Sequence, residues 1–177
     1  MPPAFVPSPV LNAAFYREVV APLVRPTPHA AALLGWGSDV LGYDSARSTD
    51  HGWGPRLQVF VAGADVPAVR SRVDDGLPET FRGRPVRFGW DRTAPRHWVD
   101  VQPLGDWLTG HLGFDPRPTP TTLDWLTAPQ QKLLGGVRGA VYTDPAGDLS
   151  AVRSALRWYP RNVWLWLIVR WPGTLPG

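Results

Sequence analysis

Hydrophobic positions near the N-terminus change from a helical to a strand-like spacing. Leu11, Phe15 and Val19 recur every four residues, which predicts a helix. Pro22 should kink or end that helix, because proline has no N–H and its ring clashes with the preceding turn. The apolar run at 30–34 fits a buried strand and a helix-to-turn segment equally well, since periodicity alone does not separate the two.

The next segments alternate between strand and helix patterns. The runs at 56–62 and 97–104 have the length and the valine content of strands. A third strand is predicted over 84–90, where Pro85 favours a place at a sheet edge. Residues 65–77, between the first two runs, follow a helical pattern.

From residue 121 onward the pattern is helical. The segments 121–142, 148–159 and 161–171 predict three helices. The last of them is apolar on nearly all sides, so it needs burial on several sides. We expect a partner subunit, for example in a homodimer, or further chain of a longer relative to cover it.

These patterns predict the fold class α/β (α+β). A small mixed β-sheet with flanking helices is expected over 1–115, after a mobile lead-in at 1–9, and a short helical bundle over 116–177. Apolar residues make up 44% of the 177 residues and charged residues 19%, so the chain can bury a sizeable core.

Charge and cysteine content exclude several classes of protein. The net charge of +3 comes from arginines scattered along the chain, so nucleic acid is not an expected partner. The absence of cysteine excludes disulfides, thiolate metal sites and cysteine nucleophiles. The longest apolar run, 163–169, is too short to cross a bilayer, and the proline-broken N-terminus does not resemble a signal peptide. We therefore expect a cytoplasmic protein.

A glycine-rich turn occupies the stretch "GWGSDVLGYDSARSTDHGWGP". Gly37 and Ser38 lie in this turn, where glycine lets backbone N–H groups approach a phosphate. Such turns are common, and a purely structural turn is the simpler interpretation.

Two carboxylates extend the phosphate-binding interpretation. Asp50 precedes the strand predicted at 56–62, and Asp100 lies inside the strand predicted at 97–104. If these strands are neighbours, both carboxylates can face the same phosphates through a divalent cation. Hard oxygen ligands of this kind suit Mg²⁺ or Mn²⁺.

The order and spacing of these features resemble the DNA polymerase β-like nucleotidyltransferase superfamily. The segments "AALLGWGSDVLGYDSARSTDHGWGPRLQVF" and "YPRNVWLWL" are similar to a little-characterised bacterial branch that adds a C-terminal helical domain. The resemblance implies an enzyme that moves a nucleoside monophosphate from an NTP to a hydroxyl acceptor.

The resemblance also implies roles for individual residues. Gly37 and Ser38 match the motif that holds the nucleotide phosphates, and Asp50 matches the first metal-binding carboxylate. Asp100 matches the third carboxylate, which binds metal and orients or deprotonates the acceptor hydroxyl. The second metal-binding aspartate is replaced by Gly52, and longer relatives continue past the C-terminus of this chain.

Gly52 leaves two hypotheses open. One is a metal-dependent nucleotidyltransferase that works without the second aspartate. The other is a degenerate or repurposed homologue that binds a small molecule or a protein partner. Because alternate residues of a strand share a face, His51 cannot replace the missing group. Asp39 and Asp44 are loop carboxylates that could bend into the site.

Further residues are expected near the pocket. Arg47 and Arg56 flank the Asp50 segment and could contact a triphosphate, although a solvated surface arginine is an equal alternative. Trp36 and Trp53 bracket the turn and, with His51 and Gly52, are predicted to line the pocket.

Overall fold

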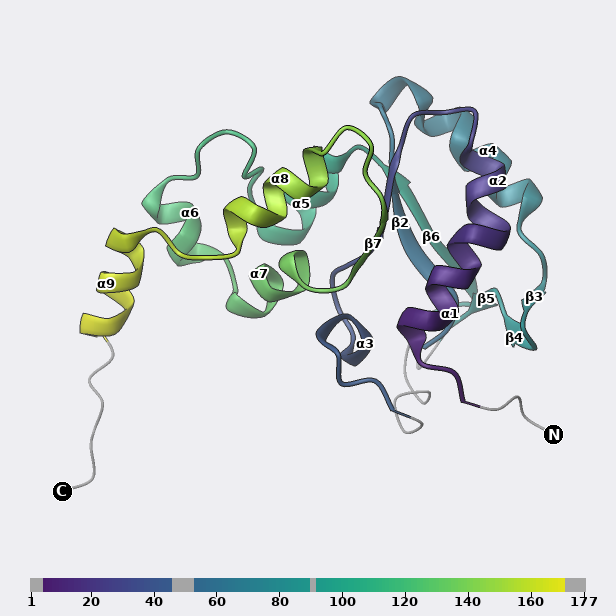
Figure 1. The fold of residues 1–177 in the computed structure, drawn as a ribbon, viewed down its shortest axis with the longest axis horizontal. Coiled ribbons are helices and arrows are strands. Elements are labelled where there is room, and N and C mark those ends of the chain that lie inside the picture. Colours follow the sequence, from purple (N-terminus) through teal and green to yellow (C-terminus); the bar gives the residue numbers. More distant parts are fainter. Residues whose placement is uncertain (1–4, 46–52, 90–91, 171–177) are drawn as a thin grey trace.

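The structure is a computed structural model that describes residues 5–45, 53–89 and 92–170. Its centre is a five-stranded mixed sheet in the order β5-β6-β2-β1-β7 (Figure 1). The strands are β1 (Ala30–Leu33), β2 (Arg56–Phe60), β5 (Arg87–Phe88), β6 (Arg96–Gln102) and β7 (Ala140–Thr143). Only β2 and β6 pair in parallel; the other neighbours are antiparallel. The predicted α/β class is confirmed, and the run at 30–34 is a strand.

A layer of helices covers one side of the sheet. It consists of α1 (Ser8–Phe15), the π-helical turn η1 (Tyr16–Val20), α2 (Ala21–Val24) and α4 (Val66–Gly76), the last preceded by a short 3-10 turn at Gly63–Asp65. Pro22 lies at the start of α2, and the widened π turn before it accommodates the missing N–H and the bulk of the ring. Burial of one core holds this layer on the sheet: Leu11, Phe15, Val24, Leu57, Val59, Val69, Val73, Val99 and Val101.

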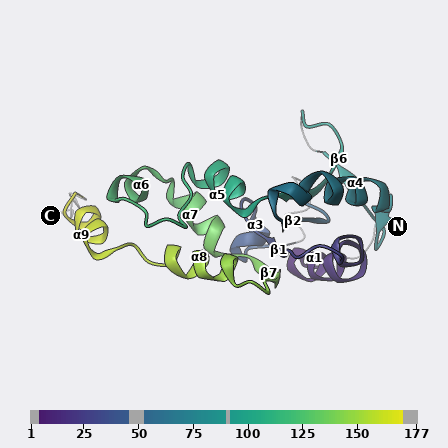
Figure 2. The ribbon, with the colours of Figure 1, turned by 90° about the horizontal axis from the view of Figure 1, so that it is seen from above.

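The C-terminal helices extend away from the other side of the sheet. They are α5 (Leu104–Leu112), α6 (Thr122–Thr127), α7 (Gln130–Val137), α8 (Asp148–Leu156) and α9 (Arg161–Arg170). Figures 1 and 2 both show α9 farthest from the sheet. A second core joins these helices to the sheet: Ala32, Leu34, Phe60, Trp107, Leu108, Leu112, Leu149, Val152 and Val163.

The strand predicted over 84–90 is divided into two short strands in the structure. Residues 84–90 supply β4 (Arg84–Pro85), which pairs with β3 (Thr80–Phe81) in a separate two-stranded sheet, and then β5 at the edge of the main sheet. Proline cannot donate to a central ladder, so its place in a small peripheral sheet follows from its chemistry.

The single helix predicted over 121–142 is wrong. Pro129 separates α6 from α7, and Gly139 then turns the chain at φ +83° into the strand β7. Since β7 pairs with β1, the C-terminal segment contributes an edge strand to the sheet. The division of the chain near residue 115 remains a prediction.

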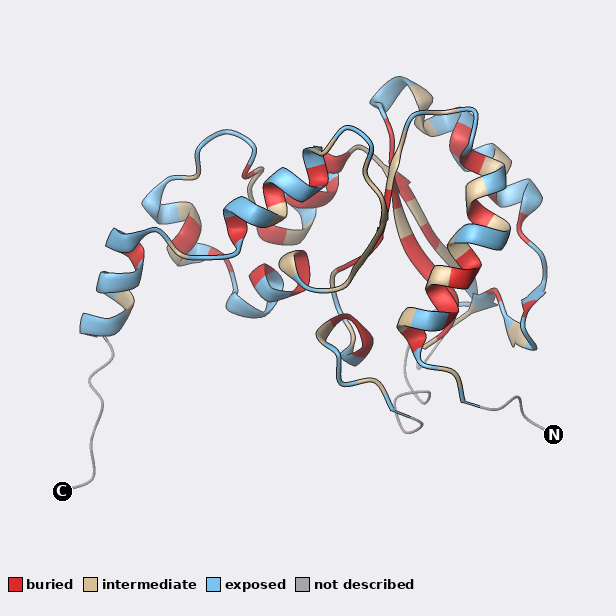
Figure 3. Cartoon of the chain, viewed as in Figure 1, coloured by how far each residue is buried: buried red, intermediate tan, exposed pale blue. Residues whose placement is uncertain are grey.

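Helix α9 carries exposed apolar side chains. Val163 is buried, but the exposed residues include Trp164, Leu165, Trp166, Ile168 and Val169 (Figure 3). The predicted apolar helix is therefore present, and the partner expected to cover it remains a prediction. None of the helices in the described ranges is long and apolar enough to span a bilayer.

Candidate functional site

A cavity of about 220 Å³ surrounds Asp100. We call it the Asp100 cavity. It lies where the chain leaves β1 and where β2 and β6 run side by side. Its lining consists of Leu34, Gly35, Trp36, Arg56, Gln58, Arg96, His97, Trp98, Asp100, Trp107 and His111. The structure therefore brings together Asp100, Trp36 and Arg56 of the residues predicted for the site.

The parallel register of β2 and β6 sets the residue beside Asp100. Gln58 is the register partner of Asp100, so the two side chains share a face of the sheet. The Gln58 side chain accepts a hydrogen bond from the Leu34 N–H (2.8 Å) and donates one to the Leu34 carbonyl (3.3 Å). The Asp100 carboxylate accepts a hydrogen bond from the Gln102 side chain. The side chain next to Asp100 is therefore the Gln58 amide, which is hydrogen-bonded to the backbone of Leu34.

Arg56 lies at the base of the cavity in a buried ion pair. Its Nη2 donates to Asp39 Oδ1 (2.6 Å) and to the Trp36 carbonyl (2.7 Å), and only 3% of the residue is exposed. Asp39 also accepts a hydrogen bond from the Ser8 hydroxyl, while Asn12 accepts one from the Arg56 N–H. The surface-arginine interpretation is therefore wrong, and a contact between Arg56 and a triphosphate remains a prediction.

The hydrogen bonds of Asp39 and Asp44 show whether these two loop carboxylates are free to replace the aspartate that is missing at position 52. Asp39 is held by Arg56 and Ser8 in the interior. Asp44 accepts a hydrogen bond from the Ser8 N–H at the start of α1 and another from the Trp53 indole (3.4 Å). Both carboxylates serve the packing of α1 rather than the Asp100 cavity.

Aromatic rings form much of the cavity wall. The Trp36 ring lies 4.3 Å below the Arg56 guanidinium and meets Trp98 edge-on at 6.1 Å between ring centroids. Trp107 stacks on the His111 imidazole at 4.6 Å, and His111 Nε2 contacts the Lys132 carbonyl at 2.8 Å. Burial lowers the pKa of His111, which favours the neutral imidazole. The cavity therefore combines aromatic rings with one carboxylate and the cations Arg56 and Arg96.

The glycine-rich turn has a structural explanation in the Arg56–Asp39 pair. Gly37 adopts φ +114° and ψ 147°, a region almost restricted to glycine. A Cβ at this position would lie 2.2 Å from Asp39 Oδ1 and 2.6 Å from Arg56 Nη2. Ser38 is exposed and begins the short helix α3 (Ser38–Leu41). Phosphate binding by Gly37 and Ser38 remains a prediction, but the ion pair alone accounts for the glycine.

The remaining predicted residues divide into two groups. Arg47, Asp50, His51 and Gly52 lie outside the described residues. Trp53 is placed away from the Asp100 cavity, because its ring lies 4.0 Å below the Arg84 guanidinium and packs against the core under α1. Trp36 lines the Asp100 cavity and Trp53 is not in its described lining. That the two tryptophans bracket one pocket together with His51 and Gly52 remains a prediction.

A divalent cation finds few ligands among the described residues. Asp100 is the single carboxylate in the described lining of its cavity, and the described ranges hold no cluster of three or more metal-ligating side chains. Magnesium needs several oxygen ligands in near-octahedral geometry. The described residues alone do not fit a Mg²⁺ or Mn²⁺ site, and Gly52 has no side chain to offer.

Several lining residues were not predicted from the sequence. Gln58, Trp98, Trp107 and His111 come from β2, β6 and α5. Trp98 was within reach of sequence reasoning, because it lies two residues before Asp100 on the same strand face. His111 and Trp107 reach the cavity only through the packing of α5 on the sheet, which has no local sequence signal.

One comparison with known proteins gives a match. The family described as "Domain of unknown function (DUF4037)" matches residues 125–175, which include α7, β7, α8 and α9. No curated protein matches the chain, and no solved structure matches it. The match therefore concerns the C-terminal segment, to which the sequence of that family is similar.

Proposed function

We propose that this chain is a small-molecule binding module with a nucleotidyltransferase-like fold that has lost metal-dependent nucleotide transfer. The observation that carries the proposal is the composition of the Asp100 cavity. In the described lining, one carboxylate lies among tryptophan and histidine rings. Gln58, at the neighbouring strand position, has a side-chain amide that is hydrogen-bonded to the Leu34 backbone.

The shape and chemistry of the cavity favour a planar nitrogen-containing ring over a whole nucleotide. A volume of about 220 Å³ is below the usual range of roughly 300–1,000 Å³ for sites of drug-sized ligands. Trp36, Trp98 and Trp107 place aromatic rings in the lining, and the Asp100 carboxylate can accept hydrogen bonds from ring or amino N–H groups. A nucleobase or a similar heterocycle combines these properties.

Loss of metal chemistry follows from the missing carboxylate. Dehydration of Mg²⁺ is costly, so the ion is held only where enough anionic oxygens replace its waters. At the position that the superfamily resemblance assigns to the second aspartate, this chain has Gly52. With Asp100 as the remaining ligand in the described lining, we expect Mg²⁺ affinity too weak to support transfer.

A thermal-shift titration tests the proposal. The purified chain is titrated with adenine, guanine, cytosine, uracil, their nucleosides and the four NTPs, each with EDTA and with Mg²⁺. A ligand that binds the folded state raises the midpoint of unfolding. We expect at least one base or nucleoside to raise it equally with EDTA and with Mg²⁺, and Asp100→Asn to reduce that shift.

Two results would contradict the proposal. A shift that appears only with an NTP and Mg²⁺, and that Asp100→Asn abolishes, would indicate a working metal-dependent site. No shift with any base, nucleoside or NTP would leave the cavity without the proposed class of ligand. The variant Gly52→Asp is the matched control: a gain of Mg²⁺-dependent NTP binding there shows that only the carboxylate was missing.

A further inference from the structure

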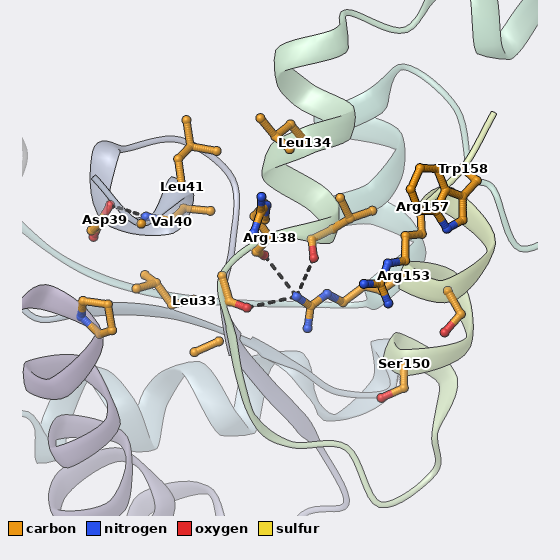
Figure 4. A pocket seen from close by; sticks show the side chains of 16 residues that line it. Leu33, Asp39, Val40, Leu41, Leu134, Arg138, Ser150, Arg153, Arg157 and Trp158 are labelled. Atoms are coloured by element: carbon orange, nitrogen blue, oxygen red, sulfur yellow. Dashed lines mark hydrogen bonds between the residues drawn. The ribbon is translucent and has the colours of Figure 1, made fainter. Parts of the chain in front are cut away.

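A second and larger cavity lies at the edge strand β7, away from Asp100. It has a volume of about 960 Å³ and is bounded by α3, the end of α7, β7 and α8 (Figure 4). Its polar lining includes Arg138, Arg153, Arg157, Ser150 and Ser154. We call it the arginine cavity.

One face of α8 supplies most of these groups. Ser150 and Ser154 are four residues apart, as are Arg153 and Arg157, so they lie on adjacent rows of the helix. Arg138 follows α7 and, in Figure 4, lies between the α3 residues and Arg153, whose Nη2 donates to its carbonyl. Three arginines and two hydroxyls from separate elements therefore surround the same space.

Arg153 is fixed in place by backbone carbonyls. Its Nη2 donates to the carbonyls of Val137 (2.7 Å), Arg138 (3.2 Å) and Gly139 (2.9 Å), which caps the end of α7. Its Nε is buried and has no hydrogen-bond partner among the described residues.

The positive charge of this cavity is not matched by carboxylates. In the described ranges no ion pair joins Arg138, Arg153 or Arg157 to an acidic side chain. The one carboxylate in the lining belongs to Asp39, which is buried and already paired with Arg56. Three like charges around one cavity favour an anion between them.

We infer that the arginine cavity binds the phosphate or diphosphate group of a small organic ligand. Guanidinium groups match phosphate oxygens with paired N–H donors, and serine hydroxyls add further donors. The volume exceeds that of one phosphate, and apolar side chains of Leu41, Leu134 and the exposed Trp158 line the rest. The phosphate end is therefore at the arginines and the organic part at this apolar rim. This inference does not depend on the function proposed for the Asp100 cavity.

Calorimetric titration with pyrophosphate tests the inference. EDTA is present throughout, and ionic strength is held constant with sodium chloride so that general screening is the same in every sample. We expect saturable binding to the unmodified chain. Arg138→Gln and Arg157→Gln should each weaken it about tenfold or more, since each removes a charge-assisted contact. Both side chains are exposed, and no described hydrogen bond uses either guanidinium, so these variants should fold.

Matched controls separate this site from the other cavity. Arg17→Gln removes the same charge from an exposed side chain outside the cavity lining and should leave pyrophosphate binding unchanged. Asp100→Asn should also leave it unchanged, because Asp100 lines the other cavity. The inference is overturned if the unmodified chain shows no saturable binding. It is also overturned if the double variant of Arg138 and Arg157 binds pyrophosphate as well as the unmodified chain does.

Discussion

The Asp100 cavity and the arginine cavity differ in how their charged side chains are paired. Around the Asp100 cavity several polar groups have partners: Arg56 pairs with Asp39, Gln58 bonds to Leu34, and Asp100 accepts from Gln102. Arg56 Nε and His97 Nδ1 are buried without a hydrogen-bond partner among the described residues. Around the arginine cavity, none of the three cations has a carboxylate partner within the described ranges.

This difference distinguishes structural charges from charges that a ligand can use. A buried ion pair has its charges matched, and a ligand that bound either group would have to displace an existing partner. Cations that share a cavity without counter-charges lower their free energy when an anion enters. The glycine-rich turn that the superfamily resemblance emphasises lies beside the Arg56–Asp39 pair, whereas the three arginines of the arginine cavity lie in the C-terminal segment.

The largest loss of stability should come from breaking the Arg56–Asp39 pair. Asp39→Asn leaves the Arg56 guanidinium buried without a counter-charge, which we expect to reduce the free energy of unfolding by about 3–5 kcal/mol. Urea denaturation measures this change. Glu18→Gln, which breaks the exposed pairs with Arg17 and Arg82, is the control and should have a far smaller effect. Equal midpoints for Asp39→Asn and the unmodified chain would show that the pair contributes nothing.

The next largest loss of stability tests whether the Arg56–Asp39 pair is the reason that residue 37 is a glycine. Gly37→Ala should cost about 3 kcal/mol or more, because its backbone region is nearly restricted to glycine and the new methyl group meets Asp39 and Arg56. Gly42→Ala is a matched control with φ +87° and no atom within 4 Å of the added Cβ. It should cost only about 1–2 kcal/mol. Similar losses in the two variants, measured by thermal or urea unfolding, would rule out the steric explanation.

Within the arginine cavity, the three arginines should differ in their effect on stability. Arg153→Gln removes the donors that cap α7, so we expect a loss of about 1.5–3 kcal/mol in the free energy of unfolding. Arg157→Gln should stay within about 0.5 kcal/mol, because that side chain is exposed. Chemical denaturation of both variants checks the difference, and a large loss for Arg157→Gln would mean that it has a structural partner.

Acid should weaken the protein partly through His111. Burial lowers the pKa of this imidazole below its ordinary 6.5, so the unfolded chain takes up the proton at higher pH than the folded chain does. Its contribution to stability is therefore present above about pH 6.5 and is lost as the pH falls toward the folded-state pKa. Thermal midpoints measured between pH 5 and pH 8 should fall less steeply on acidification for His111→Gln. An unchanged slope would contradict this assignment.

The smallest change in stability is expected from a substitution of Tyr142. Burial raises the pKa of its phenol, and the hydroxyl is buried without a hydrogen-bond partner among the described residues. Tyr142→Phe should therefore be neutral or slightly stabilising at pH 7, because it removes an unsatisfied polar group. The ring stacking with Tyr16 at 5.4 Å is retained. A clear loss of stability in denaturation experiments would indicate a partner for the hydroxyl.

Much of the fold follows from local sequence patterns. The strands β2 and β6, the helix α4 and the C-terminal helices α8 and α9 were predicted from periodicity and from proline and glycine positions. The strand β7 was not, since "GAVY" at 139–142 fits the end of the apolar helical pattern predicted over 121–142. In the structure Pro129 and Gly139 interrupt that pattern before β7. These four residues form a strand because they pair with β1, which lies more than 100 residues earlier in the chain. A pattern read over neighbouring residues does not contain that pairing.

The cavities were harder to predict than the fold. Asp100 and Trp36 were expected near a pocket, and both line the Asp100 cavity. The partner of Arg56 was missed, because Asp39 is 17 residues away and its role depends on how α3 packs against α1. The arginine cavity gave no signal either, since its arginines look like ordinary exposed cations until α7, β7 and α8 bring them together.

The central claim is that the Asp100 cavity works without a metal ion. The most direct test is electron paramagnetic resonance of Mn²⁺ with each of the four NTPs, in the presence and absence of the protein. We predict that the Mn²⁺–nucleotide spectrum does not change when the unmodified chain is added, and that Gly52→Asp produces a protein-bound signal. A protein-bound signal with the unmodified chain that disappears in Asp100→Asn would contradict the account and indicate a metal-dependent nucleotide site.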